Sequence, residues 1–200
     1  MLPPDMTRVC LVGDADTQLR YELLSRETSR EALQTYDLHA PYENTLGVET
    51  VSLGAAISLL NDLNWYLVRF VDEALVLEPS VSEDEWLSRD LARAIRDDEI
   101  QPEETGRLLK VYGIERPEPS GPPTGVTSDS GDVGDDGSAS QAEESSAPDG
   151  EDAEAGDERL SRLVEPMYLT RTGDGIPTYD IRDVEDTLVV RVTEAEFEAG

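Results

Sequence analysis

One internal segment of the 200-residue chain limits what the rest of it can fold into. Residues 117–158 contain 13 acidic residues and no basic residue, and they lack Leu, Ile and every aromatic residue. A segment of this composition cannot bury enough apolar surface to offset the conformational entropy lost on folding. We therefore predict three parts: a core domain over 1–116, a disordered acidic linker over 117–158 and a β-rich segment over 159–200.

Two roles are open for the acidic linker. Its like charges would keep it extended, so that it acts as a solvated spacer between the two flanking parts. It could instead mimic nucleic acid or shield a basic patch elsewhere. The spacer is the favoured interpretation, because acidic residues are abundant along the whole chain and carry little information about a specific role.

The charge balance indicates the salt concentration and the cellular compartment for which the protein is suited. Asp and Glu number 45 against 16 Lys and Arg, a net charge of −29, and Lys110 is the single lysine. Such a charge disfavours nucleic acid and anionic membranes as partners and opposes compaction. Roughly molar salt would screen it, because the Debye length is then about 3 Å. We expect an extremely halophilic archaeal source and a cytoplasmic location.

Few residues of the chain could carry catalysis or bind a metal. Cys10 is the single cysteine and His39 the single histidine, so we expect no disulfide, no Cys/His metal site and no cofactor. The amino terminus lacks the basic region and long apolar run of a signal peptide. Translation could start at Met1 or at Met6.

The first half of the expected core contains short elements. Residues 7–13 form an apolar, β-branched run that predicts a buried strand. Apolar and polar residues alternate over 18–24, which favours a half-buried strand, although a helix capped by Asp16 stays open. Thr28 and Glu31 have the spacing of a capping box and predict a short helix after them.

The most apolar stretch of the chain follows. "LGVETVSL" predicts a strand, and the helical spacing that begins after it predicts a helix capped by Ser52. The residues on the apolar face of that helix are Leu53, Ala56, Ile57, Leu60 and Leu63. Residues 65–71 are apolar on both faces and predict a central strand in which Trp65, Tyr66 and Phe70 dominate the burial. Polar residues interrupt this stretch too often for a membrane helix.

Arg69 stands out within that expected strand. We expect a packed stem and a head paired with a carboxylate near a sheet edge, and the alternative is an anion clamp. For residues 72–78, helix and strand both remain open.

Two helices are expected next, over 83–112, the first capped by Ser82 and the second starting at Pro102. Basic side chains recur on both of them, which suggests a DNA-binding helix-turn-helix as an alternative function. These candidate nucleic-acid-binding residues are Arg89, Arg93, Arg96, Arg107 and Lys110. Acidic residues lie among them, so surface ion pairing is the favoured interpretation.

The last segment resembles a small β-meander. "MYLTRT" and "IPTYDIR" are separated by Gly-Asp-Gly and predict a hairpin, and "TLVVRV" predicts a strong strand. A piece of this size is too small to fold alone. We expect it to dock onto the sheet of the core or onto a second copy of the chain.

"CLVGDADT" is similar to the first strand of haloacid-dehalogenase-like phosphotransferases, which ends in Asp-x-Asp. That resemblance implies a nucleophile at Asp14 and a general acid at Asp16. The Gly-Thr that usually follows is missing, and Lys110 does not precede the adjacent pair Asp97-Asp98. A turn of small and acidic residues is the favoured explanation of this motif. A small phosphotransferase or phosphatase is therefore only the third functional hypothesis.

The stretch "SLGAAISLLNDLNWYLVRFVDEALVLEPSVSEDEWLSRDLARAIRD", with "TRVCLVG" and "RYELLSRETSREAL" before it, resembles a family of small uncharacterised haloarchaeal proteins. The resemblance implies no known activity and no site residues. We predict an α+β or α/β core with a mixed sheet and helices. The leading hypothesis is a non-catalytic interaction or regulatory protein that binds a protein partner or itself, with no catalytic residues, no metal, no cofactor and no membrane contact.

Overall fold

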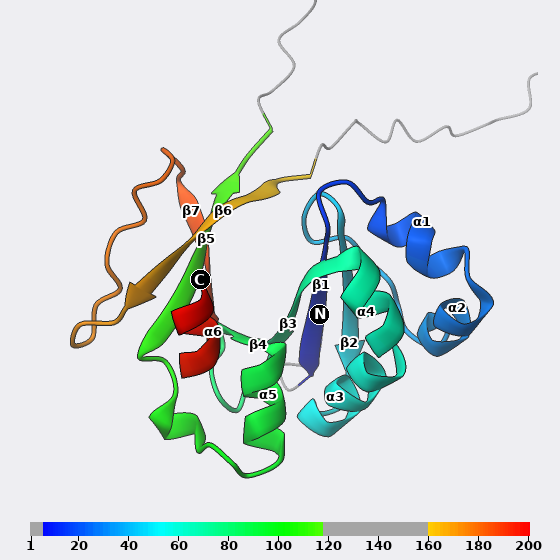
Figure 1. Ribbon diagram of the computed structural model, residues 1–200, viewed down its shortest axis with the longest axis horizontal. Helices are drawn as coiled ribbons and strands as arrows, with labels where there is room; N and C mark the ends of the chain where they lie inside the picture. The colour runs from blue at the N-terminus through cyan, green and yellow to red at the C-terminus, as the bar shows by residue number, and fades with distance from the viewer. Residues whose placement is uncertain (1–5, 118–159) are drawn as a thin grey trace, which may run out of the picture. The chain divides into compact units, whose positions relative to one another are not determined.

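The structure is a computed structural model, and it describes residues 6–117 and 160–200. These residues form an α+β fold built on a mixed seven-stranded sheet with helices packed against it, as predicted (Figure 1). The expected acidic linker lies outside the described residues, apart from Pro117. Among the described residues, no helix combines the length and the apolar character needed to cross a bilayer.

The strands are arranged in the order β2-β1-β3-β4-β7-β5-β6. Their bounds are β1 Thr7–Gly13, β2 Thr45–Thr50, β3 Val71–Leu77, β4 Trp86–Ser88, β5 Leu108–Glu115, β6 Arg162–Thr170 and β7 Asp186–Arg191. Neighbours run antiparallel except β4 and β7, which are parallel. Strand β7 lies between β4 and β5, so the C-terminal segment supplies an interior strand of the sheet.

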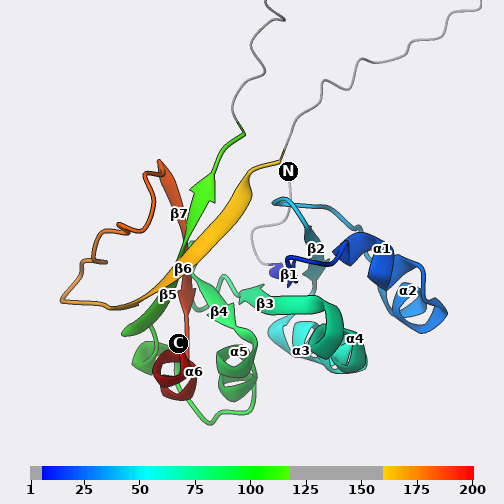
Figure 2. The same cartoon turned by 45° about the horizontal axis from the view of Figure 1, so that its top comes forward.

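The helices form two groups. Their bounds are α1 Leu19–Leu24, α2 Glu27–Leu33, α3 Leu53–Asp62, α4 Asn64–Phe70, α5 Arg89–Arg96 and α6 Glu194–Ala199, with a 3₁₀ turn at Pro102–Glu104. Helices α1 to α4 gather beside β1, β2 and β3, whereas α5 and α6 lie near β4 and β7 (Figures 1 and 2).

Several elements match the sequence-based predictions. Strand β1 has the predicted bounds, and strands occur at β2 and at β7. The Ser52 hydroxyl accepts a hydrogen bond from the Ala55 backbone N–H at 3.2 Å, as expected for the cap of α3. A short helix also forms at α2, but Thr28 does not cap it, because the helix already starts at Glu27.

Residues 18–24 contain a helix and not the favoured strand. Leu19 and Leu23 are both buried, while Tyr21 between them is 67% exposed. Residues four apart lie on one face of a helix, so this spacing buries both leucines at once. The alternative prediction of a helix is thus the correct one for this segment, but Asp16 does not cap the helix, which begins after Gln18.

Residues 65–70 are also helical, and the predicted central strand over 65–71 is wrong, since only Val71 belongs to a strand, β3. Leu63, Tyr66 and Leu67 are buried at helical spacing, whereas Trp65 is 53% exposed and Val68 is 78% exposed. The expectation that Trp65 dominates the core burial is therefore wrong. Some apolar residues of this stretch are buried in the core and others are exposed on the surface. In a strand covered on both faces, all of them would be buried.

The predicted helix pair over 83–112 is wrong as well. Helix α5 starts only at Arg89, where the Ser88 hydroxyl caps it by accepting the Leu91 backbone N–H at 3.2 Å. After one 3₁₀ turn the chain enters β5, in which buried Leu109 alternates with half-buried Lys110. Residues 72–78, for which helix and strand were open, belong mostly to β3.

The predicted C-terminal hairpin is replaced by a different pairing. Strand β6 pairs with β5, and residues 176–182 form an irregular loop over the sheet. Tyr179 of this loop is buried, and its hydroxyl donates a hydrogen bond to the Glu165 carbonyl at 2.7 Å. Its packing against the sheet takes the place of a strand pairing.

A half-buried ion-pair cluster ties the C-terminal segment to the rest of the sheet. Glu85, just before β4, pairs with Arg171 through one oxygen and with Arg191 through the other, the latter at 2.5 Å. Arg191 also donates to the Thr105 hydroxyl at 2.9 Å. These contacts link parts of the chain more than 80 residues apart.

The sheet divides the apolar core into three clusters. On β1 and β3, one face packs against the helices, while Cys10 and Leu75 on the opposite face join a cluster with Tyr112, Leu188 and Val190 of β5 and β7. A third cluster lies on the other face of β5 under the Tyr179 loop. Since β1 is four places from β5 in the sheet order, the shared second cluster shows that this face is concave.

Candidate interaction surface

A polar contact joins β3 and β5 across the concave face of the sheet. The Lys110 Nζ atom lies 2.5 Å from the Glu73 Oε2 atom, and the Tyr112 hydroxyl donates to the same oxygen. We call these three residues the Glu73 latch. Glu73 is on β3 and the other two are on β5, with β4 and β7 between them in the sheet order. The latch therefore holds together two parts of the sheet that are not neighbouring strands.

Tyrosine rings enclose the charged end of Lys110. Its Nζ atom is 5.1 Å from the centre of the Tyr112 ring and 5.6 Å from that of Tyr168 on β6. The side chains of Lys110 and Glu73 are only 14% and 12% exposed. A desolvated cation held between a carboxylate and two ring faces is a favourable arrangement.

The pKa shifts of Lys110 and Tyr112 keep each of these two groups in one ionisation state at neutral pH. Burial alone would lower the pKa of Lys110, but the hydrogen bond and charge of Glu73 outweigh it and raise that pKa. Burial, reinforced by the Glu73 carboxylate, raises the pKa of Tyr112 far above its ordinary value. Lys110 thus stays protonated and Tyr112 stays neutral, so neither group is tuned for proton transfer near neutral pH.

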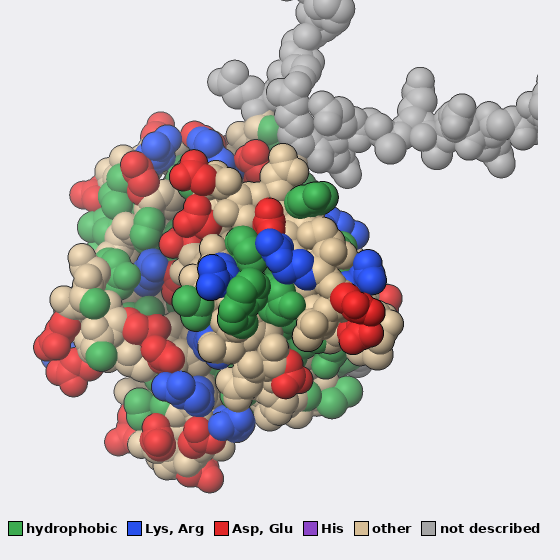
Figure 3. Space-filling view, turned by 45° about the vertical axis from the view of Figure 1, so that its right-hand side comes forward, with side chains coloured by type: hydrophobic (Ala, Val, Ile, Leu, Met, Phe, Trp, Pro, Cys, Tyr) green, Lys and Arg blue, Asp and Glu red, His purple; other side chains and the backbone are tan. Residues whose placement is uncertain are grey.

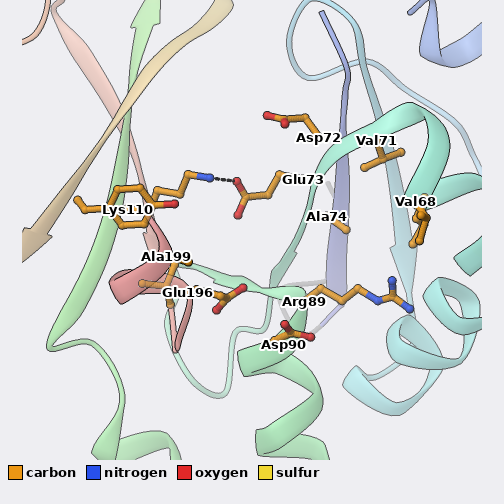
Figure 4. Close-up of a pocket in the computed structure, with 13 residues that line it drawn as sticks. Val68, Val71, Asp72, Glu73, Ala74, Arg89, Asp90, Lys110, Glu196 and Ala199 are labelled. Atoms are coloured by element: carbon orange, nitrogen blue, oxygen red, sulfur yellow. Dashed lines mark hydrogen bonds and ion pairs between the residues drawn. The ribbon is translucent and has the colours of Figure 1, made fainter. Parts of the chain in front are cut away.

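A groove of about 410 Å³ adjoins the latch. Its walls come from α4 and β3 on one side and from β6 and α6 on the other, with α5 below (Figure 4). Its apolar lining consists of Leu67, Val68, Val71, Ala74, Val192 and Ala199. Charged residues line it as well, namely Asp72, Glu73, Arg89, Asp90, Lys110 and Glu196. The groove therefore combines apolar and charged lining, with Asp72 and Arg89 toward opposite ends (Figure 4).

The outer side of α4 carries two exposed apolar residues. Trp65 and Val68 lie there, and Val68 also lines the groove, so the exposed surface and the groove are continuous. The Arg69 guanidinium stacks 4.4 Å from the centre of the Trp65 ring. Figure 3, which views the side of the molecule that bears α1 to α4, shows hydrophobic side chains gathered in the middle with basic side chains on either side. We call Trp65, Val68 and Arg69, together with the groove, the α4 surface.

Arg69 does not fulfil the expectation drawn from the sequence. It is exposed on a helix, not packed at a sheet edge, and within residues 6–117 and 160–200 it makes no ion pair with a carboxylate. Its stacking on Trp65 leaves the N–H edge of the guanidinium open to solvent or to a ligand.

The candidate nucleic-acid-binding residues do not share one helix pair. Arg89, Arg93 and Arg96 lie on α5, where Arg89 faces the groove and the other two pair with Asp90 and Asp97. Arg107 lies exposed before β5, and Lys110 belongs to the latch. The structure therefore brings together at most part of this set.

Asp14 and Asp16 lie in an exposed turn after β1. The Asp14 side chain accepts the Asp16 backbone N–H at 3.0 Å, which is the local bond of an Asx turn. Cys10 is fully buried, and burial raises its pKa to about 12, so it is not a reactive thiol. Within the described ranges, no group of three or more His, Cys, Asp or Glu residues is placed to hold a metal ion.

The sequence reasoning missed both the latch and the α4 surface. A signal for the latch existed, because Lys110 is the single lysine of a chain that otherwise uses arginine. The contact with Glu73 is not local, however, and depends on the curvature of the sheet. For α4, the spacing of Leu63, Tyr66 and Leu67 was the available signal for a helix with an exposed outer side.

Comparison with known proteins identifies a family but no activity. No curated protein and no solved structure matches the chain. Residues 7–114 match a family of unknown function, DUF5804. That region includes the latch and α4, together with strands β1 to β5 almost to the end of β5. The chain belongs to the DUF5804 family.

Proposed function

We propose that this protein is a non-catalytic interaction protein that binds another polypeptide through the α4 surface. The observation that carries the proposal is the exposure of Trp65 and Val68, at 53% and 78%, next to a groove that is lined in part by apolar residues. A single exposed apolar residue is common on proteins, but two beside a groove form a contiguous patch. Trp and Arg are also the residue types most enriched where binding energy concentrates.

The chemistry of the groove favours binding over catalysis. Its most buried ionisable pair, Lys110 and Glu73, is mutually neutralised, and the pKa of Lys110 is raised away from neutral pH. A general acid or base would need a pKa shifted toward neutral pH. A groove that combines a neutralised ion pair with apolar lining residues is suited to receive a side chain of a partner.

The setting of this interaction follows from composition. We propose that the protein works in the cytoplasm of a halophilic organism, in which salt screens its net charge of −29. The nearly complete replacement of Lys by Arg supports the same proposal, since a flexible apolar Lys stem is poorly suited to a strongly hydrated surface.

Site-directed photo-crosslinking tests the proposed function. Because Cys10 is fully buried, a thiol-reactive benzophenone would label a Val68→Cys variant at residue 68 alone. Val51→Cys is the matched control, since Val51 is a valine of similar exposure, 81%, outside the α4 surface. Each labelled protein is irradiated in a lysate of its source cells at molar salt.

We expect a discrete polypeptide adduct from residue 68 that excess unlabelled wild-type protein suppresses, and no such adduct from residue 51. The absence of an adduct from residue 68, or equal adducts from both positions, would contradict the proposed function.

A further inference from the structure

We infer that the partner segment which the α4 surface receives is acidic and apolar: an apolar side chain close in sequence to one or more carboxylates. This inference rests on the proposed function and adds the chemistry of the occupant. The charges around Val68 carry it.

Two guanidinium groups flank Val68. Arg69 follows it on α4 and stacks on Trp65 on the exposed side of that helix. Arg89, from α5, lines the groove together with Val68 (Figure 4). Arg89 makes two long hydrogen bonds of 3.4 Å, to the Leu60 carbonyl and to Asn61 at the end of α3. Within the described parts of the chain, neither guanidinium pairs with a carboxylate, in contrast to Arg93 and Arg96 on the outside of α5.

The acidic residues of the groove are mostly engaged elsewhere. Glu73 is held in the latch, and Glu196 accepts hydrogen bonds from Ser88 at 2.7 Å and from the Thr193 backbone at 2.8 Å. Asp90 lies 3.4 Å from Arg93. The cations of Lys110 and Arg93 offset the charges of Glu73 and Asp90 and so reduce the negative field that an incoming carboxylate would meet, whereas Glu196 keeps its charge.

The two ends of the groove differ in charge, because Asp72 lines one of them. It lines the end opposite to Arg89, and the two side chains point away from each other (Figure 4). No ion pair of Asp72 occurs in the part of the chain that the structure describes. A bound segment would therefore place a carboxylate at the Arg89 end of the groove, because Asp72 repels one at the other end. Arg69, on the exposed side of α4, offers a second contact outside the groove lining.

The physical chemistry of the rim fits this occupant. A guanidinium stacked on an aromatic ring keeps a planar fork of N–H donors that matches a carboxylate. In the groove, Val68 and Val71 offer apolar contact for a neighbouring side chain. For a chain of net charge −29, a local basic rim is also what would let an acidic partner approach.

An unbiased peptide selection tests the inference. Short random peptides are displayed and selected against the immobilised full chain at molar salt, and the selected peptides are then titrated against variants. The test variant is the double substitution Arg69→Gln/Arg89→Gln. The control is Arg20→Gln/Arg30→Gln, which removes two exposed arginines of α1 and α2.

We expect the selected peptides to combine an apolar residue with nearby Asp or Glu. Their affinity should fall about tenfold or more in the test variant, because each substitution removes a charge-assisted hydrogen bond between a guanidinium and the peptide. The affinity should be unchanged in the control. Peptides without acidic residues, or affinities that are equal in both double variants, would overturn the inference. So would failure to select any binder, or displacement of the peptides by a second copy of the chain.

The proposed function has a separate readout in the same titration. Peptides that bind independently of Arg69 and Arg89 but no longer bind Val68→Glu would refute the acidic partner and leave the proposed function standing. Binding that survives Val68→Glu as well would contradict the proposed function itself.

Discussion

Removing the Lys110 charge should destabilise the fold through Glu73. In Lys110→Met, the Glu73 carboxylate keeps the Tyr112 hydrogen bond but loses its cation, and its side chain is only 12% exposed. Removal of one partner from a fully buried ion pair costs about 3–5 kcal/mol. Because this pair retains some solvent contact and one hydrogen bond, we expect a loss of about 2–3 kcal/mol in the free energy of unfolding.

A second substitution separates charge from packing. In Lys110→Met/Glu73→Gln, the neutral amide oxygen still accepts the Tyr112 hydroxyl, and no uncompensated charge remains at the latch. The double variant should therefore recover about 1–2 kcal/mol relative to Lys110→Met alone, the cost of a buried unpaired charge being removed. Lys110→Arg should not restore wild-type stability, because the planar guanidinium differs in shape and hydration from the ammonium enclosed by two tyrosine rings.

The assay is urea unfolding at fixed molar salt and neutral pH, followed by tryptophan fluorescence. The pKa of Lys110 is raised on folding, so the stability it contributes is fully present below its ordinary pKa. It is lost only as the pH rises through the higher folded value. A Lys110→Met variant as stable as the wild type, or a double variant less stable than the single one, would refute the reasoning.

Three further outcomes are expected from the packing. Gly113→Ala should cost about 1–3 kcal/mol in urea unfolding, because its Cβ atom would lie 2.9 Å from the Tyr179 ring; wild-type stability would show that the loop moves away freely. Burial alone would raise the pKa of Glu85, but its two arginine partners lower it, so its contribution is present above 4.5 and lost as the pH falls through the folded value. The difference in unfolding free energy between wild type and Glu85→Gln should therefore shrink in acid, and a difference that does not change with pH would exclude this origin. Ser88→Ala should cost about 1–2 kcal/mol, since it removes the cap of α5 and a hydrogen bond to Glu196, and an unchanged urea midpoint would contradict both roles.

The elements that could be predicted from the sequence are those whose signal is local. The β-branched run of β1 and the Ser52 cap of α3 depend on neighbours within a few residues, and both were predicted correctly. Residues 65–71 failed because continuous apolar character does not distinguish a buried strand from a helix with an exposed outer side. Tertiary structure made the choice, by burying Tyr66 and Leu67 and leaving Val68 exposed.

The helix pair over 83–112 failed for a related reason. Charged residues and good helix formers suggested two helices, yet β4 and β5 are strands, since β4 pairs with β3 and β7 and β5 pairs with β6 and β7. Strands β6 and β7 lie far from them in the sequence. Such pairing overrides local propensity. The candidate site shares this limit, since Arg89 of α5 and Val68 of α4 line the same groove only in the folded chain.

Competition in the crosslinking reaction tests the binding role of the α4 surface most directly. Benzophenone-labelled Val68→Cys protein is irradiated in lysate with increasing amounts of unlabelled Val68→Glu or Val51→Glu, two substitutions of equal chemistry at similarly exposed valines. We predict that Val51→Glu suppresses the adduct as well as the wild type does, and that Val68→Glu requires a concentration about tenfold higher or more. Equal suppression by the two variants would show that the partner does not bind at the α4 surface.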